Sequence, residues 1–210
     1  MSAALLDLLF PPRCAGCRAP GSGWCPACAA SLRPVPVEWL DGTPLIAAGR
    51  LEGAWQRAIH TYKYRGRPQL AAALAGHLAP AVQAAGIRPA GLTFIPLHPA
   101  RQRARGFNQA ERLARCLAPR LGLPLHAGLT RDRDTPPQVG LDQAARQDNV
   151  AGAFRWAGPD PPPPGLALVD DVCTTGATLQ AAAQAVAAVG GRLSGYLVLA
   201  VAPVQTLPGG

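Results

Sequence analysis

One segment near the carboxyl end of the chain constrains the fold more than any other. It covers residues 166–178 and reads Leu-Ala-Leu-Val-Asp-Asp-Val-Cys-Thr-Thr-Gly-Ala-Thr. Its four consecutive apolar residues are typical of a strand that is covered on both faces. An Ala-rich stretch with the pattern of a helix follows and ends at Gly190-Gly191. A buried strand that leads through two carboxylates and a Thr/Gly turn into a helix indicates an α/β protein.

The same alternation of strands and helices extends over most of the chain. We expect strands at 45–51, 92–97, 166–169 and 193–201, helices at 53–62, 69–85, 107–121 and 177–189, and a polar loop around 130–140. This pattern predicts a mainly parallel sheet flanked by helices over residues 45–210. Residues 1–33 are expected to form a separate small module, and residues 34–44, which contain several prolines, a linker.

Composition and charge narrow the class of protein. With 49% hydrophobic and 15% charged residues, the chain is not wholly disordered. No apolar run reaches the length of a transmembrane helix. The apolar start contains Asp7 and lacks a basic segment, so it reads as an amphipathic helix and not as a signal peptide. We therefore expect a cytoplasmic protein without membrane insertion. The net charge of +8 favours an anionic partner such as phosphate or nucleic acid.

Four of the six cysteines form two Cys-x-x-Cys pairs, Cys14 with Cys17 and Cys25 with Cys28. In a reducing compartment such pairs are metal ligands more often than disulfides. Four thiolates complete a tetrahedral zinc site and leave no open position for water, so the zinc is expected to be structural. Redox dithiols and an iron–sulfur cluster are the alternatives.

The segment that constrains the fold also carries the chemistry. Ligands of open α/β sheets lie at the carboxyl ends of the strands, and backbone N–H groups at a helix N-terminus suit a phosphate. Threonine hydroxyls add donors, and the two carboxylates can accept hydrogen bonds from sugar hydroxyls. Phosphate and hydroxyls together indicate a ribose 5-phosphate; the simpler alternative is a helix cap. The residues expected to contact this ligand are Asp170, Asp171, Thr174, Thr175, Gly176, Ala177 and Thr178.

This segment resembles the phosphoribosyl pyrophosphate (PRPP) signature of the type I phosphoribosyltransferases. The resemblance implies a type I phosphoribosyltransferase-like fold and PRPP bound with Mg²⁺. It also implies that Asp170 and Asp171 hold the ribose hydroxyls and that residues 174–178 hold the 5-phosphate.

Further motifs narrow the family. The four-cysteine module is followed in order by Tyr-Lys-Tyr-Arg-Gly at 62–66, Ile-Pro-Leu-His-Pro at 95–99, Arg-Gly-Phe-Asn-Gln at 105–109 and Thr-Pro-Pro-Gln at 135–138. Together they resemble the competence protein F (ComF) family across nearly the whole length, although the spacing between the cysteine pairs is short. The resemblance implies a zinc ribbon joined to a phosphoribosyltransferase-like domain. Its implied role is the handling of single-stranded DNA in natural transformation, with a competence helicase as a further partner. An active phosphoribosyltransferase of nucleotide metabolism and a PRPP sensor are the alternatives.

Basic residues supply two further candidate sites. Arg101, Arg103 and Arg105 follow a predicted strand, and their guanidinium groups suit a pyrophosphate, or else form a solvated basic loop. Lys63, the only lysine, lies between Tyr62 and Tyr64. Single-stranded nucleic acid is bound by basic grooves with aromatic stacking, so we expect both tyrosines to stack on bases. The residues predicted to contact nucleic acid are Lys63, Arg65 and Arg67, with Lys63 alternatively a phosphate ligand or an ordinary surface residue.

Residues 131–149 resemble the hood loop that closes over PRPP in phosphoribosyltransferases. The resemblance makes four of its side chains candidates to reach the site: Arg131, Arg133, Gln138 and Arg146. Closure of such a loop would exclude water from the reacting centre.

Overall fold

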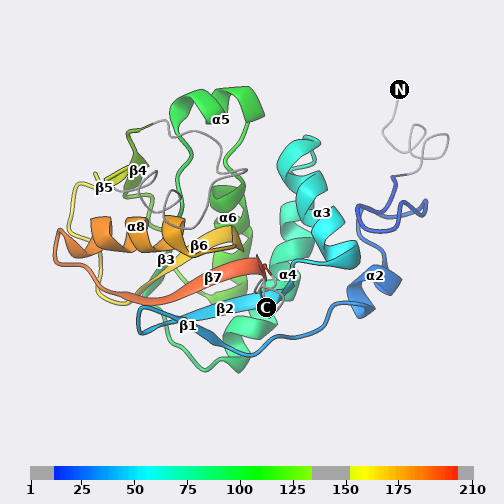
Figure 1. Cartoon of the computed structure of the whole chain (residues 1–210), viewed down its shortest axis with the longest axis horizontal. Helices are drawn as coiled ribbons and strands as arrows, with labels where there is room; N and C mark the ends of the chain where they lie inside the picture. The colour runs from blue at the N-terminus through cyan, green and yellow to red at the C-terminus, as the bar shows by residue number, and fades with distance from the viewer. Residues whose placement is uncertain (1–11, 134–151, 203–210) are drawn as a thin grey trace, which may run out of the picture.

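The computed structural model describes residues 12–133 and 152–202, and its centre is a five-stranded sheet in the order β1-β2-β7-β6-β3 (Figure 1). The strands are β1 (Glu38–Leu40), β2 (Thr43–Arg50), β3 (Gly91–Phe94), β6 (Leu166–Cys173) and β7 (Leu193–Val201). Strands β2, β7, β6 and β3 are parallel, and β1 is an antiparallel edge strand on β2. The expected α/β fold with a mainly parallel sheet is confirmed.

Helices cover this sheet, and a hairpin packs against one of them. The larger helices are α3 (Gly53–Tyr64), α4 (Leu70–Ala84), α6 (Gln109–Leu121) and α8 (Ala177–Ala187), and the short ones are α2 (Pro26–Ala30) and α5 (Pro99–Arg105). The hairpin consists of β4 (Leu129–Arg131) and β5 (Phe154–Trp156). Helices α4 and α6 pack against each other and against the sheet, whereas α8 packs against β6 and the hairpin. No helix in the two described ranges has the length and apolar character needed to cross a bilayer.

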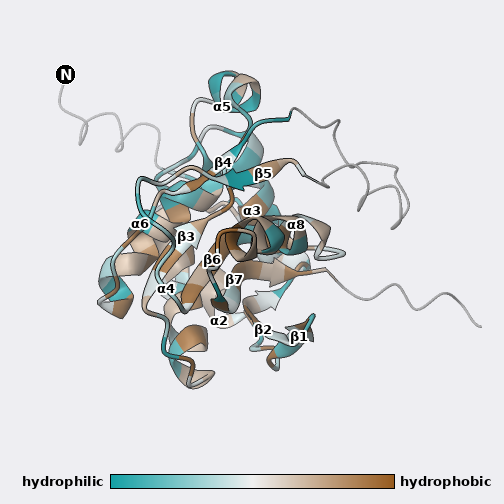
Figure 2. Cartoon of the chain, turned by 90° about the vertical axis from the view of Figure 1, so that its left-hand side faces the viewer, coloured by the Kyte–Doolittle hydropathy of each residue, from teal (hydrophilic) through white to brown (hydrophobic). Residues whose placement is uncertain are grey.

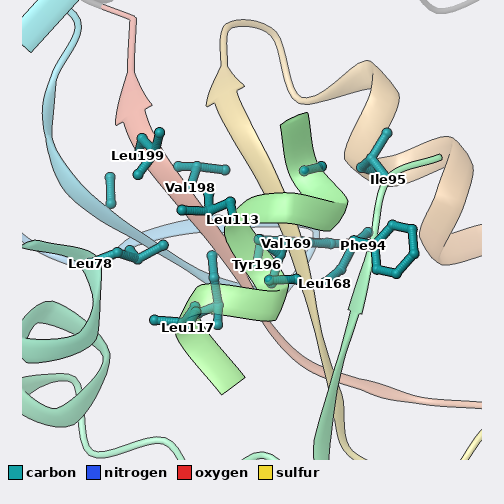
Figure 3. Packing of buried hydrophobic residues seen from close by; sticks show 14 of the residues in the cluster. Leu78, Phe94, Ile95, Leu113, Leu117, Leu168, Val169, Tyr196, Val198 and Leu199 are labelled. Carbon is teal, nitrogen blue, oxygen red and sulfur yellow. The ribbon is translucent and has the colours of Figure 1, made fainter. Parts of the chain in front are cut away.

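The core forms where the apolar stripe of α6 meets β6 and β3, next to α4 on β7 and β2. Leu113 and Leu117, one turn apart on α6, are fully buried beside Leu78 of α4 and Leu168 of β6 (Figure 3). Each buried leucine contributes roughly 1.5–3 kcal/mol of transfer free energy. The hydrophobic colouring gathers on β6, β7 and the helix faces around them, whereas α5 projects away from this core (Figure 2). The core therefore fixes β6 firmly, and β6 carries the acidic pair.

Three short elements differ from the sequence expectation. Strand β1 lies inside the expected linker, where it extends the sheet, and α5 replaces the loop that was expected to carry the arginines. Strand β4 replaces the first residues of the expected polar loop. The two strands are stabilised by hydrogen bonds to a neighbouring strand, and α5 by its caps. The hydrophobic pattern of so short a segment does not reveal such interactions. The division of the chain at residues 33 and 44 stays a prediction.

Candidate functional site

The site begins with the acidic pair at the carboxyl end of β6. The Asp171 carboxylate forms an ion pair with Lys63 from the last turn of α3, with 2.9 Å between Oδ1 and Nζ. The Asp171 side chain is only 3% exposed, and the Lys63 side chain is 22% exposed. Burial alone would lower the pKa of the Lys63 ammonium, but the charges of Asp171 and Asp170 outweigh it and raise that pKa. Lys63 therefore stays charged and neutralises part of the acidic pair.

Asp170 is also buried, and its Oδ1 accepts a hydrogen bond from the backbone N–H of Asp171 at 2.8 Å. Burial, and then the neighbouring charge of Asp171, raise the pKa of Asp170 to about 8. Two adjacent buried carboxylates cannot both ionise freely because each disfavours the charge of the other. The pair therefore carries less than two negative charges near neutral pH.

One oxygen of the pair has no partner within the described part of the chain. Asp171 Oδ2 is buried and makes no hydrogen bond to the described residues. A buried acceptor without a donor costs about 1–3 kcal/mol. Asp171 Oδ2 is therefore a strong hydrogen-bond acceptor at the end of β6, and the described residues do not supply a donor for it.

The turn after β6 leads into α8, as the sequence predicts. Gly176 has a positive φ of 82°, and a Cβ at this position would lie 2.7 Å from Cδ2 of Leu40 on β1. Glycine is therefore required both by the backbone conformation and by the close packing. Thr174 is exposed, whereas Thr175 and Thr178 are half-buried, and Thr175 Oγ1 accepts a hydrogen bond from the N–H of Ala177 at 3.5 Å. The turn thus presents hydroxyls beside the first backbone N–H groups of α8.

The three arginines predicted to clamp pyrophosphate lie on α5 and not on a loop, which corrects that expectation. His98 caps this helix, and Gly106 ends it in the left-handed conformation with φ 84°. Arg105 donates to Gln109 Oε1 at 2.6 Å, and its guanidinium carbon lies 5.3 Å from the centroid of the Tyr64 ring. Arg101 is half-buried and Arg103 is exposed. Their contact with a pyrophosphate stays a prediction.

The residues predicted to bind nucleic acid divide between two places. Lys63 lies at the acidic pair, whereas Arg67 donates to the backbone carbonyl of Arg13 at 2.8 Å and Arg65 is exposed at the end of α3. Tyr62 is fully buried and donates to the Gln109 carbonyl at 2.6 Å. The expectation that Tyr62 stacks on a base is therefore wrong, because its ring belongs to the core.

The four cysteines converge as predicted. Their Sγ atoms all lie within 4.8 Å of one another, and those of Cys17 and Cys25 are 3.7 Å apart. Two thiolates on one tetrahedral zinc ion, each about 2.3 Å from the metal, would be separated by about 3.8 Å. The backbone N–H groups of Gly16 and Cys25 also approach Cys14 Sγ, each at 3.4 Å. The donor set and its spacing fit a structural zinc.

The zinc module packs against the α/β core through contacts that the sequence did not indicate. Trp24 Nε1 donates to His77 Nε2 of α4 at 2.9 Å, and the Trp24 ring meets the Trp55 ring of α3 edge-on. Burial lowers the pKa of His77, so its neutral ring can accept this hydrogen bond. Arg57 of α3 donates to the Gly16 carbonyl at 2.6 Å. No local pattern joins these residues, because they are far apart along the chain.

Only the first three residues of the predicted hood segment, 131–133, fall within the described residues. Arg131 belongs to β4, is buried, and places its guanidinium over the ring of Phe154 at 5.3 Å. It is therefore held in the hairpin and does not stand in a loop. Arg133 is exposed beyond β4. Gln138 and Arg146, and the motif at 135–138, lie outside the described residues.

Comparisons with known proteins agree with the sequence reading. The double zinc ribbon domain family matches residues 5–38. The DNA utilization protein YhgH of Salmonella typhi is 33% identical, and the match covers 84% of this chain and 91% of that protein. Competence protein F of Haemophilus influenzae is 39% identical over 43% of this chain and 41% of its own length. The YhgH protein of Salmonella typhimurium is 37% identical, and the match covers 60% of this chain and 58% of that protein.

Solved structures were compared as well. A glutamine mutant from an analysis of an invariant aspartic acid in HPRTs is 15% identical, with 70% of this chain and 73% of that chain covered and a TM-score of 0.36. The protein TT1426 from Thermus thermophilus is 19% identical, with 68% of this chain and 86% of that chain covered and a TM-score of 0.35. No conclusion rests on these weak likenesses. The identity and coverage of the sequence relatives suffice: the chain belongs to the YhgH and competence protein F (ComF) family.

Proposed function

We propose that this protein binds PRPP at the carboxyl end of β6 and acts in the cytoplasmic handling of single-stranded DNA during natural transformation. The observation that carries the PRPP half is the buried acidic pair of β6, with an unpartnered Asp171 oxygen, followed at once by the hydroxyl-bearing turn that opens α8. A ligand that suits both parts needs hydroxyl donors beside an anionic group. A ribose 5-phosphate has both.

The acidic pair serves the sugar in this proposal. Asp171 Oδ2 accepts a hydrogen bond from a ribose hydroxyl, which supplies the donor that this buried oxygen lacks. The Lys63 ammonium lies 2.9 Å from Oδ1 of the same carboxylate, and a charge-paired carboxylate is a strong hydrogen-bond acceptor. Because both carboxyls are largely buried, the ligand gains access only if the Lys63 side chain or the turn after β6 shifts.

The turn and α5 serve the phosphates. Thr174, Thr175 and Thr178 offer hydroxyls, and the first N–H groups of α8 point toward an anion at its N-terminus. Arg101, Arg103 and Arg105 lie on α5 and are assigned to the pyrophosphate, which needs several positive charges. Mg²⁺ would neutralise further pyrophosphate charge, and the carboxylates of Asp170 and Asp171 would be its candidate oxygen ligands in this segment.

The DNA half of the proposal rests on the relatives and on charge. The matched relatives are named DNA utilization and competence proteins, and this chain carries a net charge of +8. A basic surface binds the phosphates of single-stranded DNA and releases their counterions. A competence helicase that passes the strand on is the proposed protein partner.

A thermal-shift titration with PRPP and Mg²⁺ tests the sugar site. A ligand that binds only the folded state raises the melting temperature. Asp171→Asn and Thr175→Ala should reduce this rise, whereas Asp160→Asn, an exposed aspartate in the loop before β6, should leave it unchanged. An undiminished rise in both site variants would remove the assignment. Pyrophosphate release in the presence of candidate acceptors would identify a transferase in place of a binding protein.

A further inference from the structure

A basic cavity lies between the zinc module and α3, outside the proposed sugar site. Its volume is about 560 Å³, and its lining contains five arginines and one histidine: Arg13, Arg18, Arg57, Arg65, Arg67 and His60. Two of the arginines come from the zinc module, and the others come from α3 and the segment that follows it. No acidic residue is among the lining residues.

The positive charge of this cavity is only partly offset by the described part of the chain: Cys14 also lines the cavity, and four thiolates on one Zn²⁺ carry a net charge of −2 against five arginines. The ion pairs found there involve Lys63, Arg115 and Arg155 and none of the cavity arginines. Three of the cavity arginines, Arg13, Arg57 and Arg67, instead donate to backbone carbonyls. Arg57 donates to Gly16 at 2.6 Å, and Arg67 donates to Arg13 at 2.8 Å. A carbonyl orients a guanidinium without cancelling its charge, so the cavity is preorganised for an anion.

An aromatic surface continues from the cavity along α3. His60 lines the cavity and also packs on Tyr64, with 4.9 Å between the ring centroids. The Tyr64 side of this pair is open, since the residue is 62% exposed. The Arg105 guanidinium lies over the same tyrosine ring at 5.3 Å. An unpaired base can stack on such a surface, whereas a base inside a duplex cannot reach it.

We infer that this cavity is a binding site for the phosphates of single-stranded DNA, with an adjacent base stacked at Tyr64. The inference rests on the DNA half of the proposed function and locates the DNA-binding site on the molecule. The guanidinium forks suit phosphate oxygens, and the aromatic pair selects an unpaired strand. The zinc module then forms one wall of the DNA site, because Arg13 and Arg18 belong to it.

Fluorescence anisotropy with a labelled single-stranded oligonucleotide of about 30 nucleotides tests this site. The variant is Arg18→Gln with Arg65→Gln, which removes one exposed charge from each wall. The matched control is Arg88→Gln with Arg192→Gln, two exposed arginines that precede β3 and β7 at the amino ends of these parallel strands. Both double variants lower the net charge equally. Only the cavity variant should bind several-fold more weakly, and its log–log salt dependence should flatten by about 1.4, or roughly 0.7 for each lost phosphate contact.

Two further measurements sharpen the result. Tyr64→Ala should weaken binding of the single strand by roughly tenfold with an unchanged salt slope, because a stacked base contributes about 1–3 kcal/mol. A blunt duplex of the same length should bind the wild-type protein more weakly than the single strand at the same salt concentration.

The outcomes separate the two proposals. If the wild-type protein does not bind the single strand at about 50 mM salt, the DNA half of the proposed function fails. If it binds but the cavity variant and the charge-matched control weaken equally, the cavity is not the site and DNA binding stands. A duplex that binds as tightly as the single strand would overturn the stacking assignment. An intact PRPP-dependent thermal shift in the cavity variant shows that the variant is folded.

Discussion

Removing the ammonium group of Lys63 tests the electrostatics of the site directly. Lys63→Met keeps most of the aliphatic stem and leaves the Asp171 carboxylate without its 2.9 Å partner. Exposed ion pairs contribute about 0.2–1 kcal/mol, whereas removing one partner of a buried pair costs about 3–5 kcal/mol. Asp171 is 3% exposed and Lys63 is 22% exposed, so this pair lies between these limits and nearer the buried one. We expect the free energy of unfolding to fall by about 2–3 kcal/mol.

The second carboxylate oxygen strengthens this expectation. Asp171 Oδ2 already lacks a partner among the described residues, so the variant would leave both oxygens of a buried carboxylate uncompensated. The double variant Lys63→Met with Asp171→Asn removes both charges together. It should recover most of the lost stability, because the cost arises from the unpaired charge and not from the missing contact.

Urea unfolding and thermal unfolding, both followed by circular dichroism, measure these effects. In a chain of this size a loss of about 2–3 kcal/mol should lower the melting temperature by roughly 4–12 °C. Arg192→Met, at an exposed position, is the matched control and should change the stability by less than about 0.5 kcal/mol. A similarly small loss for Lys63→Met, or a double variant whose loss equals the sum of the two single losses, would refute the argument.

Three further predictions concern the zinc, the acidic pair and the turn. Purified protein should carry about one equivalent of zinc, and Cys25→Ser should lose the metal. Hydrogen exchange in this variant should become faster across residues 12–33 and stay unchanged in α6, whereas a native module without metal would contradict the zinc assignment. Because the pKa of Asp170 is raised to about 8, the folded state holds a proton that the unfolded chain releases above about pH 4, so stability declines as the pH rises toward 8. Asp170→Asn has no such proton to lose, so its free energy of unfolding relative to wild type should rise between about pH 5 and 8, by at most about 1.4 kcal/mol per pH unit. Urea unfolding at several pH values measures this difference, and a difference that does not change with pH would rule out the raised pKa. Gly176→Ala should cost at least about 1–2 kcal/mol, because φ is 82° and the new Cβ meets Leu40; a neutral effect in the same assay would show that the turn tolerates a side chain.

The elements that the sequence predicts well are those with a local cause. The strand at 193–201 has the predicted bounds, and the helices at 53–62 and 107–121 differ from α3 and α6 by two residues at one end. Asn108 caps α6 by accepting from the N–H groups of Ala110 and Glu111, and asparagine is a preferred residue at this position. Hydrophobic spacing and a cap act within a few residues, so a single sequence contains them.

The short elements depend on partners that a sequence does not show. Strand β1 exists because Trp39 and its neighbours pair with β2, in a region whose prolines indicate a linker. Helix α5 contains no buried residue, and its alternating arginines read equally well as a solvated loop. Arg131 was expected in a mobile loop, but the pairing of β4 with β5 holds it in a strand.

The candidate site combines both kinds of cause. The chain alone determines the four thiolates of the zinc module and the acidic pair followed by its turn, because each set lies within a short stretch whose backbone geometry is local. Only the tertiary structure decides that Lys63 reaches Asp171, that Tyr62 is buried while Tyr64 is exposed, and that arginines of the zinc module face those of α3. These residues meet because crossover helices join the parallel strands, which brings distant segments of the chain together near the carboxyl ends of the strands. The spacing of residues along the chain does not indicate which segments will meet there.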